Sequence, residues 1–451
     1  MLITILAAIM AILVVVLIHE CGHFWVARAV GIRVLKFSIG FGKPLWKRTS
    51  KAGTEYALSM IPLGGYVKML GDDTAPISEQ DKPYAYNFKP VWARMAVVAA
   101  GPLINFLLAI LLFWFIFLQG SVLVKPVVGS VIAKTPAALA GFKAGDEVVA
   151  IGGKTVEGWS PVMLALIEAS HSKPMKIQVK TSSGQLETRI LNLAKWEPDT
   201  SNPNLLDSVG LEVYMPKMAP DLAAISANSP AQKAGLQVND RITALNGKTY
   251  EQWLPLVKAI RLLPDHKVTL TVLRDKKTLQ IPVHLSKQVV LGKTQGFLGA
   301  MVKEVPLPDS MLVKRDYTVW QSLNKSVHKT YDLIRLNIVV LGKIFTGQLS
   351  VKVLGGPITV FQGAGHASHY GWLTYLGFVA FINIALGFVN LLPIPGLDGG
   401  HLLFLLAEAI RRKPLSEQVQ SVGIRLGFTA LIMIMLLATY NDLIRLFFSA
   451  H

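Results

Sequence analysis

Long uncharged stretches of hydrophobic residues alternate with polar segments along this chain, and four of these stretches are long enough to cross a membrane. A helix needs about 20 apolar residues to span the hydrocarbon core. Backbone groups in lipid must find their hydrogen-bond partners within the segment, so each stretch is predicted to be a helix. The pattern therefore predicts a polytopic α-helical membrane protein, whose four transmembrane helices lie within residues 1–30, 95–120, 372–400 and 422–447.

The distribution of Lys and Arg predicts how these helices are oriented. Residues 28–94 hold 11 basic and five acidic side chains, whereas no Lys or Arg precedes the first apolar stretch. Short loops rich in Lys and Arg stay in the cytoplasm. We therefore expect residues 28–94 and 410–425 to be cytoplasmic, and both termini and the long segment 121–371 to lie outside. The first stretch lacks the positive start and the cleavage site of a signal peptide, so we expect it to be retained as a helix.

The composition agrees with a membrane protein and disfavours several other classes. Of the 451 residues, 52% are hydrophobic and 16% are charged, against roughly 25% charged residues in soluble domains. The larger share of the net charge of +17 lies in the long outer segment, which favours an anionic membrane surface or acidic partners. No nucleic-acid partner is expected. The single cysteine, Cys21, excludes an intrachain disulfide.

An internal repeat lies in the long outer segment. Residues 131–159 and 225–253 align without gaps, with 11 of 29 positions identical. Each copy reads as a strand, a short helix that begins with Pro-Ala, and a β-rich run. The shared pattern resembles PDZ domains of the bacterial, circularly permuted kind. We therefore expect two tandem PDZ-like α+β domains, at 125–216 and 217–305, inserted between transmembrane helices 2 and 3.

The PDZ resemblance implies a peptide-binding loop in each copy. PDZ domains bind an extended chain by adding it as a strand to a sheet edge. Two interpretations stay open: the domains bind peptide, or they are spacers or steric gates with no ligand. The residues that match the ligand loops are Gly210, Leu211, Phe297, Leu298 and Gly299.

Two further segments are predicted to lie at the membrane surface. Residues 31–94 are expected to form a cytoplasmic, membrane-associated β-type loop. Within it, Ile61 to Met69 is apolar, contains glycine and is compatible with a hairpin that dips into the interface. Residues 315–345 are expected to form an amphipathic helix, because apolar side chains recur at helical spacing from Val319 to Ile338. It lies on the membrane or on the folded core, and the pattern does not distinguish these.

The candidate chemistry lies at the end of the first apolar stretch, in His19-Glu20-Cys21-Gly22-His23. Residues i and i+4 of a helix share a face, so both imidazoles can reach one Zn²⁺ ion while Glu20 stands beside a bound water. Ionisable residues inside a membrane helix are costly unless they serve a site. The motif therefore predicts a catalytic zinc centre.

A catalytic zinc site usually has three protein ligands and one open position, so a third ligand is needed. Asp398 is the only acid deep in the third hydrophobic region. The first and third helices both run from outside to cytoplasm, so His23 and Asp398 are expected to meet at the cytoplasmic side. Pro393 and Pro395 break the helix just before Asp398, which is tolerated where backbone lines a buried cavity. His401 stays an alternative ligand.

The two motifs together resemble the site-2 protease family of intramembrane metalloproteases. The resemblance covers essentially the full length of the chain and includes a G-P-x-x-N-F sequence in the second span. It also includes a Gly-Gly-Tyr stretch in the cytoplasmic loop. The residues that carry it are His19, Glu20, His23, Gly64, Gly65, Tyr66, Gly101, Pro102, Asn105, Phe106, Asn390, Pro393, Pro395, Asp398 and Gly399.

The resemblance implies the substrates and the place of the protein in the cell. The substrates would be single-span membrane proteins, such as anti-sigma factors already trimmed outside, and remnant signal peptides, cleaved by regulated intramembrane proteolysis in a stress response. The protein would lie in the lipid of the bacterial inner membrane, with both termini and the PDZ-like domains periplasmic and the active site towards the cytoplasm. The implied substrate-binding residues are Gly64, Gly65, Tyr66, Asn105, Asn390, Pro393 and Pro395.

We expect a zinc metalloendopeptidase with one Zn²⁺ per chain, in which Glu20 accepts a proton from the attacking water. The competing interpretation is a non-enzymatic zinc-binding membrane scaffold or transporter whose PDZ-like copies recruit partners. Transporters usually carry their repeat within the membrane, whereas this repeat lies outside it. The pattern favours the enzyme.

Overall fold

The structure is a computed structural model that describes residues 2–72, 76–170, 174–194, 196, 205–290, 293–303 and 305–447. The chain divides into two compact units. The first contains Met1–Ser121 and Lys314–Thr439, and the second contains Val122–Val313 and Tyr440–His451. We call them the membrane unit and the repeat unit.

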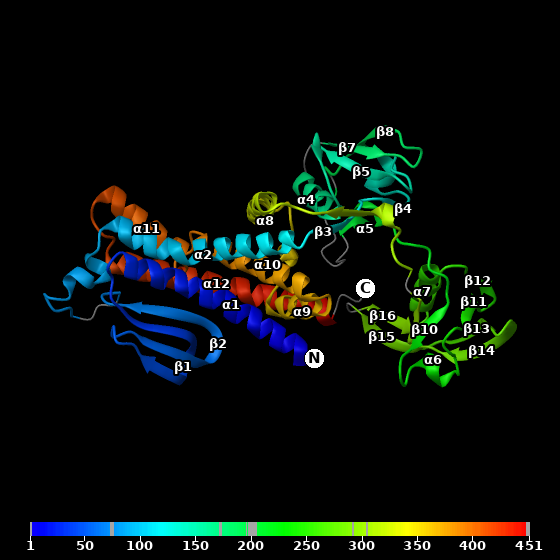
Figure 1. Cartoon of the computed structure of the whole chain (residues 1–451), viewed down its shortest axis with the longest axis horizontal. Helices are drawn as coiled ribbons and strands as arrows, with labels where there is room; N and C mark the ends of the chain where they lie inside the picture. The colour runs from blue at the N-terminus through cyan, green and yellow to red at the C-terminus, as the bar shows by residue number, and fades with distance from the viewer. Residues whose placement is uncertain are drawn as a thin grey trace. The chain divides into compact units, whose positions relative to one another are not determined.

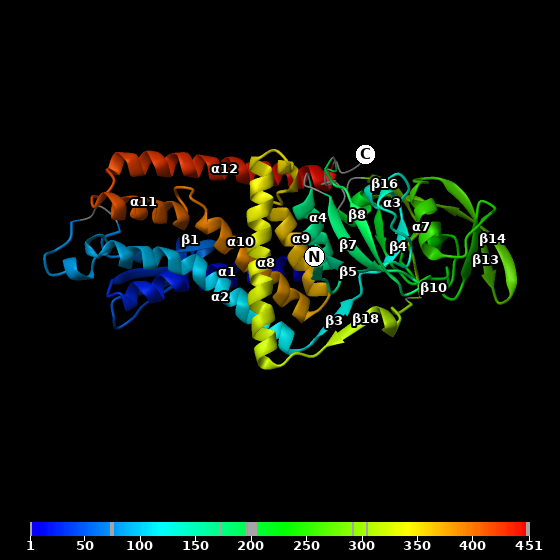
Figure 2. The same cartoon turned by 90° about the horizontal axis from the view of Figure 1, so that it is seen from above.

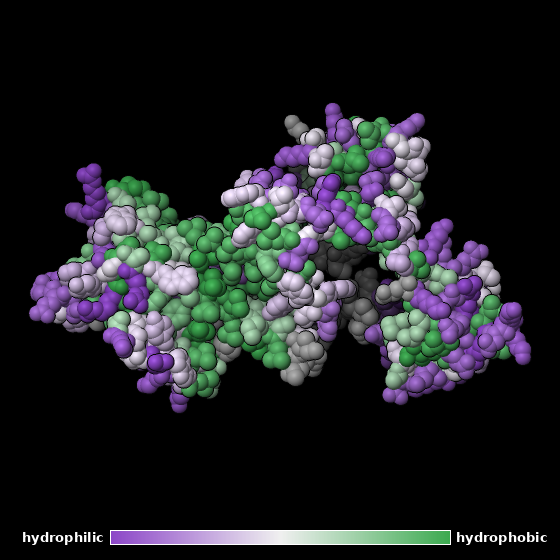
Figure 3. Space-filling model, viewed as in Figure 1, coloured by the Kyte–Doolittle hydropathy of each residue, from purple (hydrophilic) through white to green (hydrophobic). Residues whose placement is uncertain are grey.

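Four of the described helices are long and apolar enough to cross a membrane, as predicted. Their axes lie roughly parallel in Figures 1 and 2, with neighbouring spans in the sequence running in opposite directions. Figure 3 shows an almost continuous hydrophobic surface over the helices of the membrane unit. The four helices are α1 (Leu2–Ala29), α2 (Val91–Leu118), α10 (Trp372–Leu391) and α12 (Glu417–Phe447).

The third membrane helix is shorter than the predicted range 372–400. Helix α10 ends at Leu391, and a new helix, α11 (Asp398–Arg411), begins at Asp398. Pro393 and Pro395 lie in the break, where a proline removes a backbone donor and clashes with the preceding turn. The break matters because it makes Asp398 the first residue of a helix rather than part of a continuous span.

Small residues let the membrane helices approach closely. Helix α1 packs on α2 where Gly22 faces the backbone of Ala100. A Cβ on Gly22 would lie 2.8 Å from both the Ala100 carbonyl carbon and Ile104 Cγ2. Small residues at such contacts are typical of helix packing in membranes. This contact fixes the distance between the helix that carries His19 and the helix behind it.

Two further helices of the membrane unit pack on the spans. Helix α8 (Val319–Phe345) crosses α2 and α10 steeply, as Figure 2 shows. Its buried side chains include the small polar Ser322, Ser326 and Thr330, whereas Trp320 and Tyr331 are exposed. Helix α9 (Pro357–His369) packs on α1 and α10.

The segment predicted to be a cytoplasmic loop contains a β-sheet, built from β1 (Val34–Thr49) and β2 (Glu55–Met69). Both strands bend, so residues 36–39 pair with 65–68 on one side and with 55–58 on the other. Residues 65–68 therefore form an edge of the sheet within the described part of the chain. This edge lies against α1, because a Cβ on Gly65 would come within 2.8 Å of Glu20 Cγ.

The repeat unit contains two copies of one arrangement, and most equivalent elements lie 94 residues apart. Among the described residues, the two copies share a four-stranded sheet, a two-stranded sheet and two helices. The four-stranded sheets have the orders β6-β5-β7-β8 and β12-β11-β13-β14. The second copy adds a β15–β16 hairpin, where the first has the short helix α5.

The elements of the first copy are β4 (Val128–Val131), α3 (Pro136–Leu139), β5 (Glu147–Ile151), β6 (Lys154–Thr155), α4 (Trp159–Ala169), β7 (Met175–Lys180), β8 (Leu186–Leu191), α5 (Leu205–Val209) and β9 (Leu211–Val213). Those of the second are β10 (Leu222–Ile225), α6 (Pro230–Lys233), β11 (Arg241–Leu245), β12 (Lys248–Thr249), α7 (Trp253–Arg261), β13 (Lys267–Arg274), β14 (Lys277–His284), β15 (Ser286–Val290), β16 (Lys293–Phe297) and β17 (Ala300–Val302). Strands β3 (Ser121–Val124) and β18 (Leu312–Arg315) pair with each other.

The repeated sequence motif has a local physical explanation. Ser229 caps α6 by accepting a hydrogen bond from Gln232 N, and Thr135 caps α3 in the same way. Asp240 is 1% exposed, accepts from Gln237 N at 2.8 Å and pairs with Arg274 at 2.7 Å. The motif residues therefore close one helix start and one turn in each copy.

Candidate metal centre

The two histidines of the candidate site lie one turn apart on α1. Their imidazoles face the same side, with His19 Nε2 and His23 Nε2 separated by 3.2 Å. Glu20 lies between them in the sequence and is 9% exposed. The helical spacing therefore brings two nitrogen ligands to one point inside the membrane unit.

Asp398 reaches the same point from the start of α11. Its Oδ2 lies 3.2 Å from His19 Nε2 and 3.5 Å from His23 Nε2. Within the described residues, these three side chains form a group whose ligand atoms all lie within 4.8 Å of one another. His401, the alternative ligand, lies one turn further along α11 and is not in this group.

The spacing of the three ligand atoms fits a zinc ion. Zn–N and Zn–O bonds of about 2.0–2.1 Å in a tetrahedron place neighbouring ligand atoms roughly 3.3–3.4 Å apart, and the three separations here are 3.2, 3.2 and 3.5 Å. Asp398 Oδ2 is buried without a hydrogen bond from the described residues. A buried carboxylate oxygen in that state suits a cation. Two imidazoles and one carboxylate are also a usual catalytic zinc set.

The orientation of His23 is fixed by helix α2. His23 Nδ1 lies 2.8 Å from the Val97 carbonyl oxygen, which can only accept a hydrogen bond. Nδ1 therefore carries the proton, and Nε2 presents its lone pair to the group formed with His19 and Asp398. Metal-binding histidines usually donate their second ring N–H in this way.

Helix α2 also packs directly behind the histidine rings. A Cβ on Gly101 would lie 2.6 Å from His23 Cε1 and 2.8 Å from His19 Cε1, and it would meet His23 Nε2 even more closely. Only glycine leaves room for both rings at this position. The sequence showed Gly101 as part of a motif, but this contact had no signal in the sequence.

A cavity of about 1400 Å³ opens onto the three ligands. Glu20 lines it, together with Gly64, Gly65, Tyr66 and Asn390 from the predicted substrate-binding set. Asn105, Pro393 and Pro395 are not among the described residues that line it. Asn105 is instead fully buried, with its Nδ2 3.3 Å from His19 Nδ1.

Polar residues that were not predicted line the same cavity. Arg94 of α2 and Glu408 of α11 form a bidentate ion pair, with Arg94 Nη2 2.5 Å from Glu408 Oε1 and Arg94 Nη1 3.1 Å from Glu408 Oε2. Their side chains are 12% and 16% exposed. The pair ties α2 to the helix that begins at Asp398. Their separation by 314 residues explains why the sequence alone did not indicate it.

Comparison with known proteins identifies the family. The profile of peptidase family M50 matches residues 7–435. The chain belongs to peptidase family M50. The regulator of sigma-E protease RseP of Escherichia coli is 41% identical to this M50 peptidase over 441 residues, which are 97% of this chain and 98% of that protein. A Salmonella typhimurium protein with the same name is 40% identical over 443 residues, 98% of each chain.

A further relative supports the metal chemistry. A Vibrio cholerae protein, named as a zinc metalloprotease, is 38% identical over 444 residues, 98% of each chain. The family and these relatives make the chain an intramembrane zinc metalloprotease of the bacterial inner membrane. They favour the enzyme over the scaffold or transporter.

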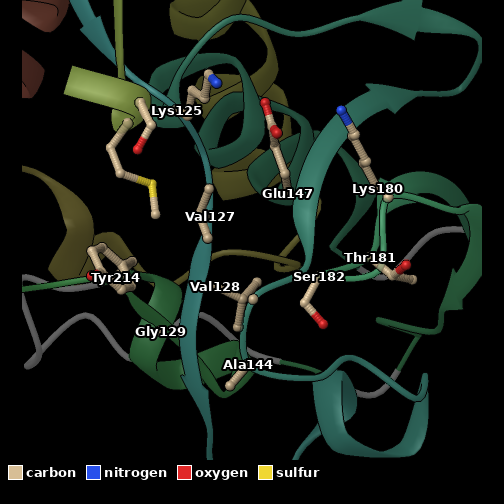
Figure 4. Close-up of a pocket in the computed structure, with 14 residues that line it drawn as sticks. Lys125, Val127, Val128, Gly129, Ala144, Glu147, Lys180, Thr181, Ser182 and Tyr214 are labelled. Atoms are coloured by element: carbon tan, nitrogen blue, oxygen red, sulfur yellow. The ribbon is translucent and has the colours of Figure 1, made fainter. Parts of the chain in front are cut away.

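A second cavity lies in the repeat unit of this M50 peptidase, as Figure 4 shows. Its volume is about 470 Å³, and Lys125, Glu147 and Lys180 are among its lining residues. The predicted PDZ ligand loops lie elsewhere. Gly210 and Leu211 are buried where α5 meets β9, and residues 297–299 join β16 to β17, with Leu298 and Gly299 buried.

Proposed function

We propose that this M50 peptidase binds one zinc ion per chain through His19, His23 and Asp398 and cleaves transmembrane segments of single-span membrane proteins. The observation that carries the proposal is the convergence of these three ligands beside Glu20 in one cavity. The helices around that cavity are long and apolar enough to lie in the bilayer. A substrate segment would therefore meet the ligands at membrane depth.

Glu20 is the proposed general base. When bound, zinc supplies a Lewis acid that polarises a carbonyl and lowers the pKa of a coordinated water to about 7. Glu20 takes the proton of the attacking water and passes it to the amide nitrogen that leaves. Glu20 lines the cavity next to Gly65, where a Cβ would come within 2.8 Å of Glu20 Cγ.

The edge of the β1–β2 sheet is the proposed substrate platform. A transmembrane helix hides its carbonyls in its own hydrogen bonds, and an unpaired amide in lipid costs several kcal/mol. Gly64, Gly65 and Tyr66 line the cavity on the free side of the edge. An unwound substrate strand could pair there while Asn390, whose Nδ2 is 3.4 Å from His19 Nε2, donates to its backbone.

The break between α10 and α11 supports the same site indirectly. Pro393 and Pro395 end the third span and turn the chain so that α11 can start at Asp398. We propose that these prolines shape the substrate channel through this turn. The first and third spans run in the same direction, so the ligands lie at matching ends of these two helices. We propose that this is the cytoplasmic side and that water enters from the cytoplasm.

The two copies of the repeat unit are proposed to be PDZ-like domains, at 125–216 and 217–305, on the periplasmic side. The matched element order of the copies supports two domains of one kind. We propose that they act as a steric gate that admits only substrates whose outer part has been removed. Deleting 125–305 should then allow cleavage of untrimmed substrate, and an active deletion variant that leaves untrimmed substrate uncut would contradict the gate.

Substrates are proposed from the relatives and the resemblance. Relatives named as regulators of sigma-E point to anti-sigma factors, and the site-2 protease resemblance adds remnant signal peptides. The amphipathic helix α8, within 315–345, is proposed to face membrane lipid with its exposed Trp320 and Tyr331.

The test is cleavage of a tagged single-span substrate by purified protein, with and without a zinc chelator. Wild-type protein should cleave, and chelation should stop it. Glu20→Gln should keep its zinc and lose turnover, whereas the control Glu79→Gln should cleave normally, because the Glu79 side chain is 85% exposed. Equal cleavage in all samples would overturn the proposal.

A further inference from the structure

Asn105 lies behind the metal centre rather than in the substrate cavity. Its side chain is 0% exposed, and it is not among the described residues that line the 1400 Å³ cavity. Asn105 Nδ2 lies 3.3 Å from His19 Nδ1.

The tautomer of His19 decides whether Asn105 must donate or accept a hydrogen bond. A neutral imidazole carries one N–H, on either ring nitrogen. His19 Nε2 faces His23 and Asp398, so a His19 that binds zinc holds its proton on Nδ1. That N–H needs an acceptor, because a buried donor without a partner is costly.

The amide of Asn105 contains such an acceptor. Asn105 Oδ1 is buried without a hydrogen-bond partner among the described residues. The oxygen and nitrogen of an amide exchange places when the group turns by half a rotation, and their assignment follows from the hydrogen bonds around them. Turning the Asn105 amide places Oδ1 against His19 Nδ1–H and pairs the two groups.

We propose that Asn105 is a positioning residue that accepts a hydrogen bond from His19 Nδ1–H and so directs His19 Nε2 towards zinc. The inference rests on the proposed zinc function. It gives α2 one continuous supporting face, because Val97, Gly101 and Asn105 are spaced four residues apart. Val97 accepts from His23, Gly101 makes room for both rings, and Asn105 accepts from His19.

Zinc affinity separates this role from contact with substrate. Asn105→Leu keeps the size of the side chain and removes the acceptor, whereas Asn105→Asp keeps the acceptor and removes the donor. Second ring-nitrogen partners of metal-binding histidines are typically worth about 10–100-fold in metal affinity or activity. We expect Asn105→Leu to weaken zinc binding by that factor and Asn105→Asp to bind zinc at least as tightly as wild type.

Asn383→Leu is the matched control. Asn383 is also 0% exposed in the membrane unit, and its Oδ1 has no hydrogen-bond partner among the described residues, but its Nδ2 donates to Val379 O. Thermal unfolding of the zinc-free forms would first show that each full-length variant folds. Chelator competition would then compare the zinc affinities of the folded variants. Asn105→Ala replaces the Leu variant if the latter does not fold.

The zinc affinities of these variants distinguish the positioning role of Asn105 from its absence. Loss of zinc affinity in Asn105→Leu, recovery in Asn105→Asp and no change in Asn383→Leu support the positioning role. Wild-type affinity in Asn105→Leu overturns it, and so does a loss in Asn105→Asp as large as that in Asn105→Leu. Failure of the proposed function itself would look different, since wild-type protein would then bind no zinc at the three ligands.

Discussion

Replacing Gly101 with alanine tests the packing of α2 against the metal centre. Gly101 faces both histidine rings and has no room for a methyl group. The helices on either side are held together by the contact of Gly22 with Ala100, so the backbones cannot separate easily. We therefore expect the added methyl to displace the rings rather than the helices.

The size of the effect follows from the distances. The new methyl carbon would lie 2.6 Å from His23 Cε1 and 2.8 Å from His19 Cε1, whereas carbon atoms in contact rest at about 3.5–4.0 Å. The rings must move by roughly 1 Å to relieve this overlap. Overpacking of this kind costs ~1–3 kcal/mol of stability. A displacement of 1 Å in a catalytic site costs on the order of 100-fold in rate.

The assay measures zinc affinity and kcat/KM for a single-span substrate on the same preparations. Gly101→Ala should lose about 100-fold in kcat/KM and bind zinc more weakly. Gly377→Ala is the control, because its Cβ would meet only Ile116 Cδ1, at an ordinary 3.9 Å. Gly101→Ala protein with wild-type zinc affinity and wild-type kcat/KM would refute the reasoning.

Three further predictions concern stability. Arg94→Leu should lower the stability of the membrane unit in detergent by ~3 kcal/mol, because it leaves a largely buried Glu408 unpaired, and a double Leu variant should lose less in the same melt. Burial alone would raise the pKa of Asp240, but hydrogen bonds from Arg274 lower it overall. The ionised Asp240 therefore stabilises the second repeat fully above the ordinary aspartate pKa of about 3.9, and this stabilisation is lost as the pH falls through the lowered pKa. In Arg274→Leu, limited proteolysis should detect unfolding of the repeat at a higher pH than in wild type. Identical proteolysis profiles of the two proteins would contradict this role of Arg274. Gly299→Ala should destabilise the same repeat by ~1–3 kcal/mol, because φ is +78° and the Cβ would collide with the serine that caps α6; unchanged hydrogen exchange in β10 and β17 would count against it.

Features with a strong local signal could be predicted from the sequence. The four helices able to cross a membrane follow from uncharged stretches of helix length, and the structure contains them. The pairing of His19 and His23 follows from the helical repeat. Asp398 could be placed near them because the first and third spans run in the same direction, and the structure brings all three together.

Features that depend on packing between distant segments could not be predicted. The G-P-x-x-N-F motif suggested that Asn105 touches substrate, but whether a side chain faces a cavity or a neighbouring ring depends on how α2 rotates against α1. The ion pair of Arg94 with Glu408 joins residues 314 positions apart. Gly365 lets helix α9 approach α1 at Thr4, which is a contact between segments far apart in the sequence.

The most direct test of the metal centre is X-ray absorption at the zinc edge on purified, zinc-loaded protein. Our account predicts a four-coordinate ion with two imidazole nitrogens and oxygen ligands at about 2.0–2.2 Å, and loss of that signal in Asp398→Ala. A sulfur ligand at about 2.3 Å, from Cys21, or an unchanged spectrum in Asp398→Ala would contradict the account.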